Sequence, residues 1–501
     1  MVTKILFGIF SGKSDHPLAD PKSARELFDG LSSSDPFEAL DEIDSWLESV
    51  CGDEQIRPKR RVDVLFQLDD IGTAAARKLT REFLAKFGSG QGRSRNHKLW
   101  QAACKFWRQL AASYGGLLEQ FEANKKLREE MRATLPVMQM RLLRAYSGCL
   151  KWEKFRYGSL DPDLWLGAGR LYLEAENSRW LEKKLVLGDG TSTTVAAEYL
   201  RLLLFNAASM DRLQPLEIEL AEQLLSHFLP AFSLTAQTRP ENVYWVDAAK
   251  PLPPTRLAKL PEPTPTLRFF ATANACSAIE TLCDEIFKRQ AVPSELVLNQ
   301  QFPVATVIAV LRHLAAFCAP QPPVRSHVRH QVKSRIRVLD GFQTIFTTLR
   351  GGDASSTFWT VEDVSEGGMR TRAEMTEHEG LGIGALLAMY PEDGDYWLIG
   401  IVRRIDRENQ TQGNIGIETV GRAPIAMDID SEGLKGEGLL LYSVLYAGEM
   451  TSLAVSPGIW QDFRPLTFVL DGQTYRLRPQ EELHRGNDYV IGRYWVDTLP
   501  A

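Results

Sequence analysis

The sequence contains few cysteines and no long apolar run. Its six cysteines are scattered over 501 residues, with no CxxC pair and no Cys–His spacing suited to zinc. We therefore expect reduced, buried thiols, no metal site and a cytoplasmic protein. The apolar run Ile5–Phe10 is too short for a secretory signal, and no run approaches the ~20 residues that span a bilayer.

The sequence also has no excess of positively charged residues. The chain has 58 Lys and Arg against 64 Asp and Glu, which gives a net charge of −6. This balance argues against a protein that binds duplex nucleic acid in general. With 44% hydrophobic residues the composition is that of an ordinary globular protein, and the length suggests about three domains.

The familiar catalytic motifs are absent as well. The sequence has no GxSxG nucleophile elbow, HExxH pair, phosphate-binding P-loop or kinase signature. The helical half has no cluster of His, Cys or paired acids. We therefore predict a protein without catalytic residues or a cofactor, although an active site in the helical half remains a third hypothesis.

Residues 1–250 follow a helical period. Asp35 is placed as an N-cap before Pro36, and Phe37, Leu40, Ile43 and Leu47 then form an apolar helical stripe. Similar stripes recur up to the helix that Pro230 ends. These patterns predict an irregular α-helical bundle over residues 1–250.

Residues 251–322 are read as a linker and a helical extension. Six prolines in 251–265 predict a stiff linker at 251–266, and helical periods then fill much of 267–322. After Pro323 the period changes to two, as in Val332 to Val338, which predicts a small antiparallel β-barrel at 323–430.

The last part, 431–501, is predicted to be a C-terminal β module. Residues 431–438 (SEGLKGEG) read as a flexible break, and Asp471-Gly472 reads as a hairpin turn. The sequence leaves open whether this module is separate or extends the barrel. The whole chain is thus expected to be a multi-domain α + β protein.

One stretch of the sequence has no acidic residue at all. Between Glu295 and Asp340 it carries only basic charge, and it includes an RxxxR pair, Arg325 and Arg329. This predicts a local anion site in an acidic chain. Farther along, at a strand end, comes a DxSxxG motif formed by Asp363, Ser365, Glu366, Gly367 and Gly368.

The two motifs, in this order and flanking strands of a small barrel, resemble the PilZ family over residues 323–430. The segments at 384–390, 397–405 and 413–420 look like that family's later strands. The resemblance implies a six-stranded barrel that binds cyclic di-GMP, a bacterial second messenger. The implied ligand-binding residues are Arg325, Arg329, Asp363, Ser365, Gly367, Gly368 and Arg404.

The residue types suit that ligand. A guanidinium can donate two hydrogen bonds to a phosphate or lie flat on a guanine, and a carboxylate such as that of Asp363 can accept from a guanine edge. The alternatives are structural. In the structural alternative, Arg325 and Arg329 only form a solvated arm, and Asp363 and Ser365 only form a turn that closes a hairpin. The spacing of 363 − 329 = 34 positions is longer than expected, with the extra length placed at 349–357.

We therefore interpret the chain as a cytoplasmic bacterial cyclic di-GMP receptor. The arm 320–331 is expected to be mobile when empty and to order around the ligand, and the helical part is expected to dock a protein partner. No membrane insertion is expected. The barrel and arm are expected to fold as a separate fragment starting near Pro320. A second hypothesis is a PilZ-like protein–protein adaptor that has lost nucleotide binding.

Overall fold

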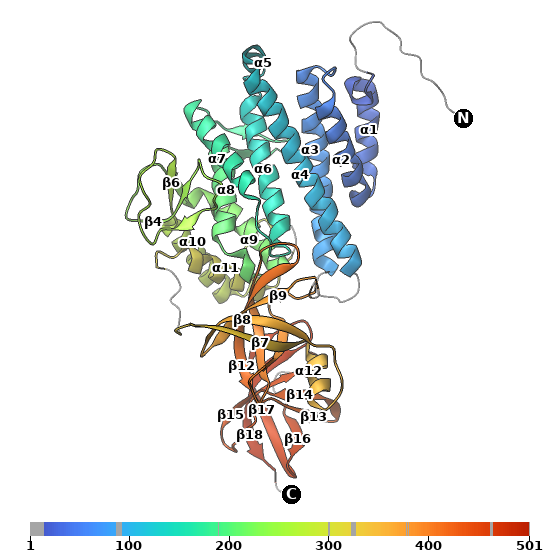
Figure 1. Ribbon diagram of the computed structural model, residues 1–501, viewed down its shortest axis with the longest axis vertical. Helices are drawn as coiled ribbons and strands as arrows, with labels where there is room; N and C mark the ends of the chain where they lie inside the picture. Colours follow the sequence, from blue (N-terminus) through green and yellow to red (C-terminus); the bar gives the residue numbers. More distant parts are fainter. Residues whose placement is uncertain are drawn as a thin grey trace, which may run out of the picture. The chain divides into compact units, whose positions relative to one another are not determined.

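The protein is described by a computed structural model that covers residues 15–86, 93–188, 190–298, 301–321, 327–376, 378, 380–460 and 464–499. The chain divides into two compact units. The first contains the helices and a small sheet, and the second contains two β-barrels (Figure 1). Two short segments from the helical part of the sequence, Arg156–Ser159 and Met210–Gln214, belong to the second unit.

The helical unit is an irregular bundle, as the sequence predicted. Its α-helices are α1 (Pro21–Ser33), α2 (Pro36–Gly52), α3 (Pro58–Lys86), α4 (Arg93–Ala123), α5 (Lys125–Glu130), α6 (Leu135–Lys154), α7 (Pro162–Asn177), α8 (Val195–Ala207), α9 (Pro215–Phe228), α10 (Ala273–Arg289) and α11 (Val304–Cys318). Short 3-10 turns are η1 (Pro17–Ala19), η2 (Met210–Arg212) and η3 (Leu229–Ala231). Among the described residues, no helix has the length and apolarity needed to cross a membrane.

Helix α2 shows how the sequence starts and orients these helices. Asp35 Oδ1 accepts hydrogen bonds from the backbone N–H groups of Phe37 and Glu38, at 2.9 and 3.4 Å, and Pro36 occupies the first helical position. Leu40, Ile43 and Leu47 are fully buried on one face. The expected cap and apolar stripe are therefore confirmed for this helix.

The expected linker at 251–266 is wrong. This segment connects β4 (Asn242–Asp247) to β6 (Leu267–Ala271), two strands of one sheet whose order is β3-β6-β4-β5. The prolines stiffen a loop inside this sheet, and the apolar run at 267–271 pairs as a strand before α10 begins. The expected helical extension at 267–322 therefore starts with a strand and belongs to the same unit as the bundle.

The remaining strands of the helical unit are short. They are β1 (Leu185–Val186), which pairs with β2 (Ser192–Thr193), and two further members of the four-stranded sheet, β3 (Ser233–Thr235) and β5 (Thr255–Arg256). The six cysteines are all free thiols, and five of them are buried. The expected burial is therefore found for five of the six thiols, whereas Cys51 is only partly buried.

The predicted small antiparallel barrel is present and closed. Its strands run in the order β10-β11-β12-β9-β8-β7. Ile336 and Val338 on β7 point into the core, whereas Lys333 and Arg335 are exposed, as the period of two requires. The strands are β7 (His330–Asp340), β8 (Thr357–Ser365), β9 (Gly368–Glu374), β10 (Leu386–Pro391), β11 (Leu398–Arg407) and β12 (Gln412–Arg422). A helix, α12 (Phe342–Leu349), lies between β7 and β8, so the extra length is not confined to 349–357 as expected.

The C-terminal part forms a second closed barrel, in the order β13-β14-β15-β18-β17-β16. Its strands are β13 (Ile425–Ser431), β14 (Leu434–Leu440), β15 (Met450–Val455), β16 (Leu466–Leu470), β17 (Gln473–Arg485) and β18 (Val490–Thr498). The expected flexible break at 431–438 is wrong, because Glu432 and Gly433, both at positive φ, make a tight hairpin turn between β13 and β14. Asp471-Gly472 makes the hairpin turn that the sequence predicted.

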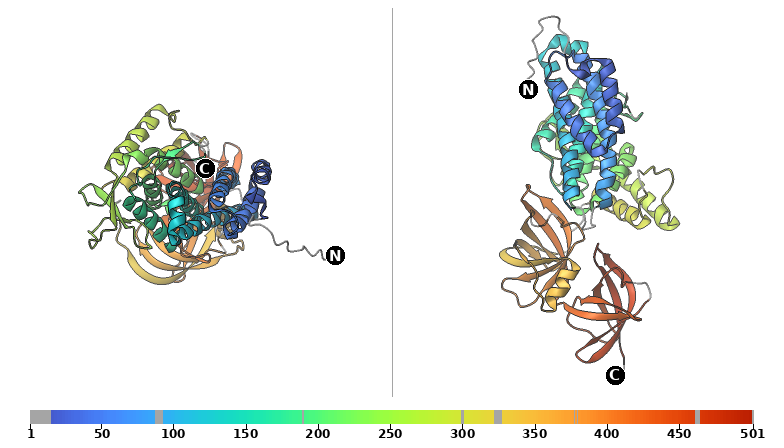
Figure 2. Two further views of the ribbon diagram at one scale, coloured as in Figure 1. Left: turned by 90° about the horizontal axis from the view of Figure 1, so that it is seen from above. Right: turned by 90° about the vertical axis from the view of Figure 1, so that its right-hand side faces the viewer.

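The two barrels share a buried apolar cluster. Leu339 and Ile399 from the first barrel pack with Leu439 and Ile491 from the second. The Tyr489 hydroxyl also donates a 2.8 Å hydrogen bond to the carbonyl of Gly384. The C-terminal module is therefore a barrel of its own that packs on the first one within one unit (Figure 2).

Candidate functional site

The RxxxR arm and the DxSxxG motif meet where β7 begins. Arg329 Nη1 donates a 2.8 Å hydrogen bond to Asp363 Oδ1. The pairing of β7 with β8 causes this contact, because Gln331 lies directly opposite Asp363. The Asp363 carboxylate is only 9% exposed, whereas the Arg329 side chain is 41% exposed. An exposed cation thus covers a nearly buried anion.

The DxSxxG motif forms the β8–β9 hairpin. Ser365 pairs with Gly368, which leaves Glu366 and Gly367 as the loop between the strands. The Ser365 hydroxyl donates a 3.1 Å hydrogen bond to the carbonyl of Gly368. The carbonyl of Gly367 accepts from the backbone N–H of Thr419 on β12, at 3.0 Å. The serine therefore has the turn-closing role that the structural alternative predicted.

Gly368 is required by close packing of two backbones. A Cβ at this position would lie 2.0 Å from the carbonyl oxygen of Ile417 on β12. At Gly367 the nearest atom is Cδ2 of the His327 ring, at 3.1 Å from such a Cβ. His327 Nδ1 also lies 3.3 Å from Glu366 Oε2. The described end of the arm therefore lies against the hairpin turn.

Arg404 is not brought together with the Arg329–Asp363 pair. In the strand register Asp363 is opposite Arg370, Arg370 is opposite Gly416, and Gly416 is opposite Arg404. Three strand spacings of roughly 4.8 Å separate Arg404 from Asp363 along this row. The Arg404 guanidinium forms an ion pair with Asp211. Its predicted contact with a ligand stays untested.

Arg325 lies outside the described residues, and so does much of the arm 320–331. Its predicted role, and the expected mobility of the arm, remain predictions.

Sequence reasoning missed Arg370. This residue is on β9, directly opposite Asp363, and its Nε lies 3.1 Å from Glu362 Oε2. The outward-facing alternation around Arg370 was visible in the sequence. Only the register of β8 and β9, which a single sequence does not specify, places it beside the motif.

Other cations of the basic stretch have aromatic partners. Arg335 lies over the Phe358 ring at 4.7 Å, and Arg337 lies over the Trp397 ring at the same distance. These contacts hold both guanidinium groups on the barrel surface away from the motif. Within the described residues, no group of three or more His, Cys, Asp or Glu side chains is arranged to hold a metal ion.

Residues 22–240 match a family model described as "Cyclic-di-GMP receptor FimW, N-terminal domain". The helical unit is similar to a domain of a cyclic-di-GMP receptor. The match covers less than half of the chain, and it lies entirely outside the barrel residues that resemble PilZ domains. No curated protein matches the chain.

Proposed function

We propose that this chain is a cyclic di-GMP receptor whose ligand binds on the first barrel, through the arm and the β8–β9 hairpin. Two independent observations support this. The helical part matches a cyclic-di-GMP receptor domain, and the Arg329–Asp363 ion pair joins two motifs that resemble a cyclic di-GMP site. The observation that carries the proposal is the ion pair, because it places an exposed guanidinium over a carboxylate at the hairpin.

The chemistry of the pair fits a guanine nucleotide. Only one N–H group of Arg329 is used on Asp363 in the contact described, and a guanidinium has five donors. The exposed side of Arg329 can therefore receive a phosphate, while the Asp363 carboxylate can accept from a guanine edge. Arg325 would supply a second guanidinium from the same arm, and Arg404 a more distant one.

The proposed mechanism is an exchange of partners at Arg329. When the ligand binds, its phosphate replaces Asp363 as the partner of the Arg329 guanidinium. The guanine edge then donates hydrogen bonds to the Asp363 carboxylate. The arm 320–331 then rearranges around the ligand. Because the arm connects the helical part of the sequence to the first barrel, this rearrangement would relay binding to the helical unit.

The relay is tested by amide hydrogen exchange of the full chain with and without cyclic di-GMP. We expect residues 327–331 to exchange markedly more slowly with ligand, while β9 and β11 change little. Exchange at 327–331 that is equally slow without ligand would mean a preformed site and would rule out the rearrangement.

The receptor is further proposed to be a bacterial, cytoplasmic, non-enzymatic protein whose helical unit docks a protein partner. The alternative is a PilZ-like adaptor that has lost nucleotide binding. It is favoured by the fact that Arg329, Arg404 and Ser365 each have a partner within the protein. Calorimetric titration of the full chain with cyclic di-GMP separates the two, because the adaptor would give no saturable heat.

A further inference from the structure

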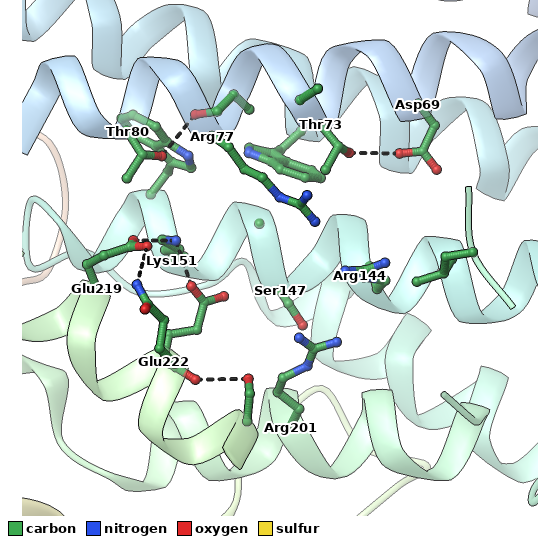
Figure 3. A pocket seen from close by; sticks show the side chains of 18 of the residues that line it. Asp69, Thr73, Arg77, Thr80, Arg144, Ser147, Lys151, Arg201, Glu219 and Glu222 are labelled. Carbon is green, nitrogen blue, oxygen red and sulfur yellow. Dashed lines mark hydrogen bonds and ion pairs between the residues drawn. The ribbon is translucent and has the colours of Figure 1, made fainter. Parts of the chain in front are cut away.

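The helical unit contains a large cavity, and the residues that line it are distant in the sequence from the barrel motifs. It has a volume of about 590 Å³ and is lined mainly by α3, α6, α8 and α9, with Trp107 of α4 (Figure 3). This volume is within the range of pockets that bind small molecules, about 300–1,000 Å³. Six Arg or Lys side chains and four Asp or Glu side chains line it, an excess of two positive charges in a chain of net charge −6.

One end of the cavity is fixed by an ion-pair cluster between α3 and α6. Arg141 Nη1 lies 2.6 Å from Asp69 Oδ2 and 2.8 Å from Asp70 Oδ1. The side chains of Arg141 and Asp69 are nearly buried, at 6% and 10% exposed, whereas that of Asp70 is 44% exposed. One guanidinium thus holds two carboxylates and offsets one of their two negative charges.

The other end is fixed in the same way between α6 and α9. Lys151 Nζ lies 2.5 Å from Glu219 Oε2 and 2.6 Å from Glu222 Oε2. Burial alone would lower the pKa of Lys151, but the two carboxylates raise it above its ordinary value. Lys151 therefore stays charged at neutral pH and holds both glutamates.

Arginines from three helices occupy the space between these ends. Arg77 comes from α3, Arg144 from α6 and Arg201 from α8, and Figure 3 shows Arg77 and Arg201 pointing toward the middle of the cavity. Arg201 also pairs with Glu198, three residues earlier on α8, which fixes its direction. Guanidinium groups that converge from different helices are the usual means of binding phosphate oxygens.

The cavity also has an aromatic wall. Trp107 and Trp152 line it, and Gly148 lets α6 approach Trp107 so closely that a Cβ there would lie 2.3 Å from the indole. An indole face or edge suits a planar ring. The cavity is also larger than a single phosphate needs. The geometry points to a second ligand site, in the helical unit, for a phosphorylated small molecule of nucleotide size. This inference does not rest on the barrel site.

The test uses the full chain with inorganic pyrophosphate as the first probe and 5′-GMP as the second, in thermal shift and calorimetric titrations at constant ionic strength. We expect saturable binding of pyrophosphate, and tighter binding of 5′-GMP if the tryptophan wall holds the base. Arg77→Gln and Arg144→Gln should each weaken binding by about tenfold, since each removes charge-assisted hydrogen bonds.

Two controls locate the site. Arg170→Gln changes an exposed arginine on α7 of the same unit and should leave pyrophosphate binding unchanged. Arg77→Gln should weaken pyrophosphate binding by the same factor when Arg329→Ala is also present, which separates this cavity from the barrel site. The inference is overturned if pyrophosphate gives no effect beyond that of sodium chloride, or if Arg170→Gln weakens binding as much as Arg77→Gln. Unchanged melting of the free variants shows that they fold.

Discussion

Arg329 and Asp363 are 34 residues apart in the sequence and form a 2.8 Å ion pair at the start of the first barrel. This single contact connects the basic arm to the β8–β9 hairpin. Its guanidinium is 41% exposed, so the contribution of the pair to the free energy of unfolding is expected to be small, about 1 kcal/mol or less. In the proposed mechanism, the ligand replaces this contact.

The carboxylate of the pair is tested by Asp363→Asn. We expect this variant to bind cyclic di-GMP about tenfold more weakly, because a charged acceptor for the guanine edge is lost. Glu362→Gln is the matched control, since it removes the same charge from the neighbouring residue, whose partner is Arg370. Calorimetry should show near-normal binding for the control. Equal weakening in both variants would mean that net charge, and not the position of Asp363, controls affinity.

The close packing at the hairpin is tested by Gly368→Ala. The new Cβ would meet the Ile417 carbonyl oxygen at 2.0 Å, so the strands must move apart. We expect the free energy of unfolding to fall by about 2 kcal/mol or more, measured by urea denaturation. Gly367→Ala meets only a side-chain atom of His327, at 3.1 Å, and should cost much less. Similar losses for both would show that the turn, and not the β12 contact, requires glycine.

The first barrel also depends on a residue from the helical part of the sequence. Tyr157 is 2% exposed and packs in the barrel core, its carbonyl accepts from the backbone N–H of Arg407 at 2.9 Å, and its hydroxyl accepts from the N–H of Ile383 at 3.3 Å. The barrel fragment that starts near Pro320 lacks this residue. Its independent folding is therefore not favoured by the structure.

Tyr157→Ala should lower the free energy of unfolding of the second unit by about 3 kcal/mol, because it leaves a large cavity in a closed core. Tyr442→Ala, at a position 47% exposed, is the control and should have little effect. Urea denaturation followed by far-UV circular dichroism measures both. A fragment of residues 320–501 that is as stable as the same unit in the full chain would contradict this role of Tyr157.

The contact between the two barrels is expected to depend on pH. His484 of β17 lies beside Arg403 of β11, with 3.0 Å between its Nε2 and Arg403 Nη2. Burial and the Arg403 charge lower the pKa of His484 below 6.5, although Glu418 opposes this. The unfolded chain therefore binds more protons than the folded one just below pH 6.5. The free energy of unfolding should decrease as the pH falls from about 7.5 to 5.

His484→Gln should reduce this pH dependence, whereas His97→Gln in the helical unit should keep it. Thermal melting across the same pH range measures the slope for each protein. A wild-type stability that rises on acidification over this interval would contradict the assigned direction.

The sequence predicted the first barrel well because period-two alternation and turn residues are local signals. The alternation of Ile336 and Val338 with charged residues placed β7 correctly, and Asp471-Gly472 marked a real hairpin. The same reasoning misread 431–438, because the glycines of a tight β-hairpin look like those of a flexible loop. It also misread the prolines at 251–266, which stiffen a loop between paired strands.

Contacts between residues that are distant in the sequence could not be predicted from the sequence alone. The approach of Arg329 to Asp363, the placement of Arg370 beside them and the insertion of Tyr157 into the barrel all depend on tertiary register. The cavity of the helical unit was invisible for the same reason. Arg77, Arg144 and Arg201 are on three helices, and each reads alone as an ordinary surface arginine.

Binding of cyclic di-GMP at Arg329 is tested by calorimetric titration of the full chain, comparing the wild type with Arg329→Ala and Arg335→Ala. Arg335 is the control, because it stacks on Phe358 away from the motif. We predict saturable binding by the wild type, a loss of roughly ten- to a hundredfold in affinity for Arg329→Ala and little change for Arg335→Ala. No binding by the wild type, or equal losses in the two variants, would exclude a cyclic di-GMP site at Arg329.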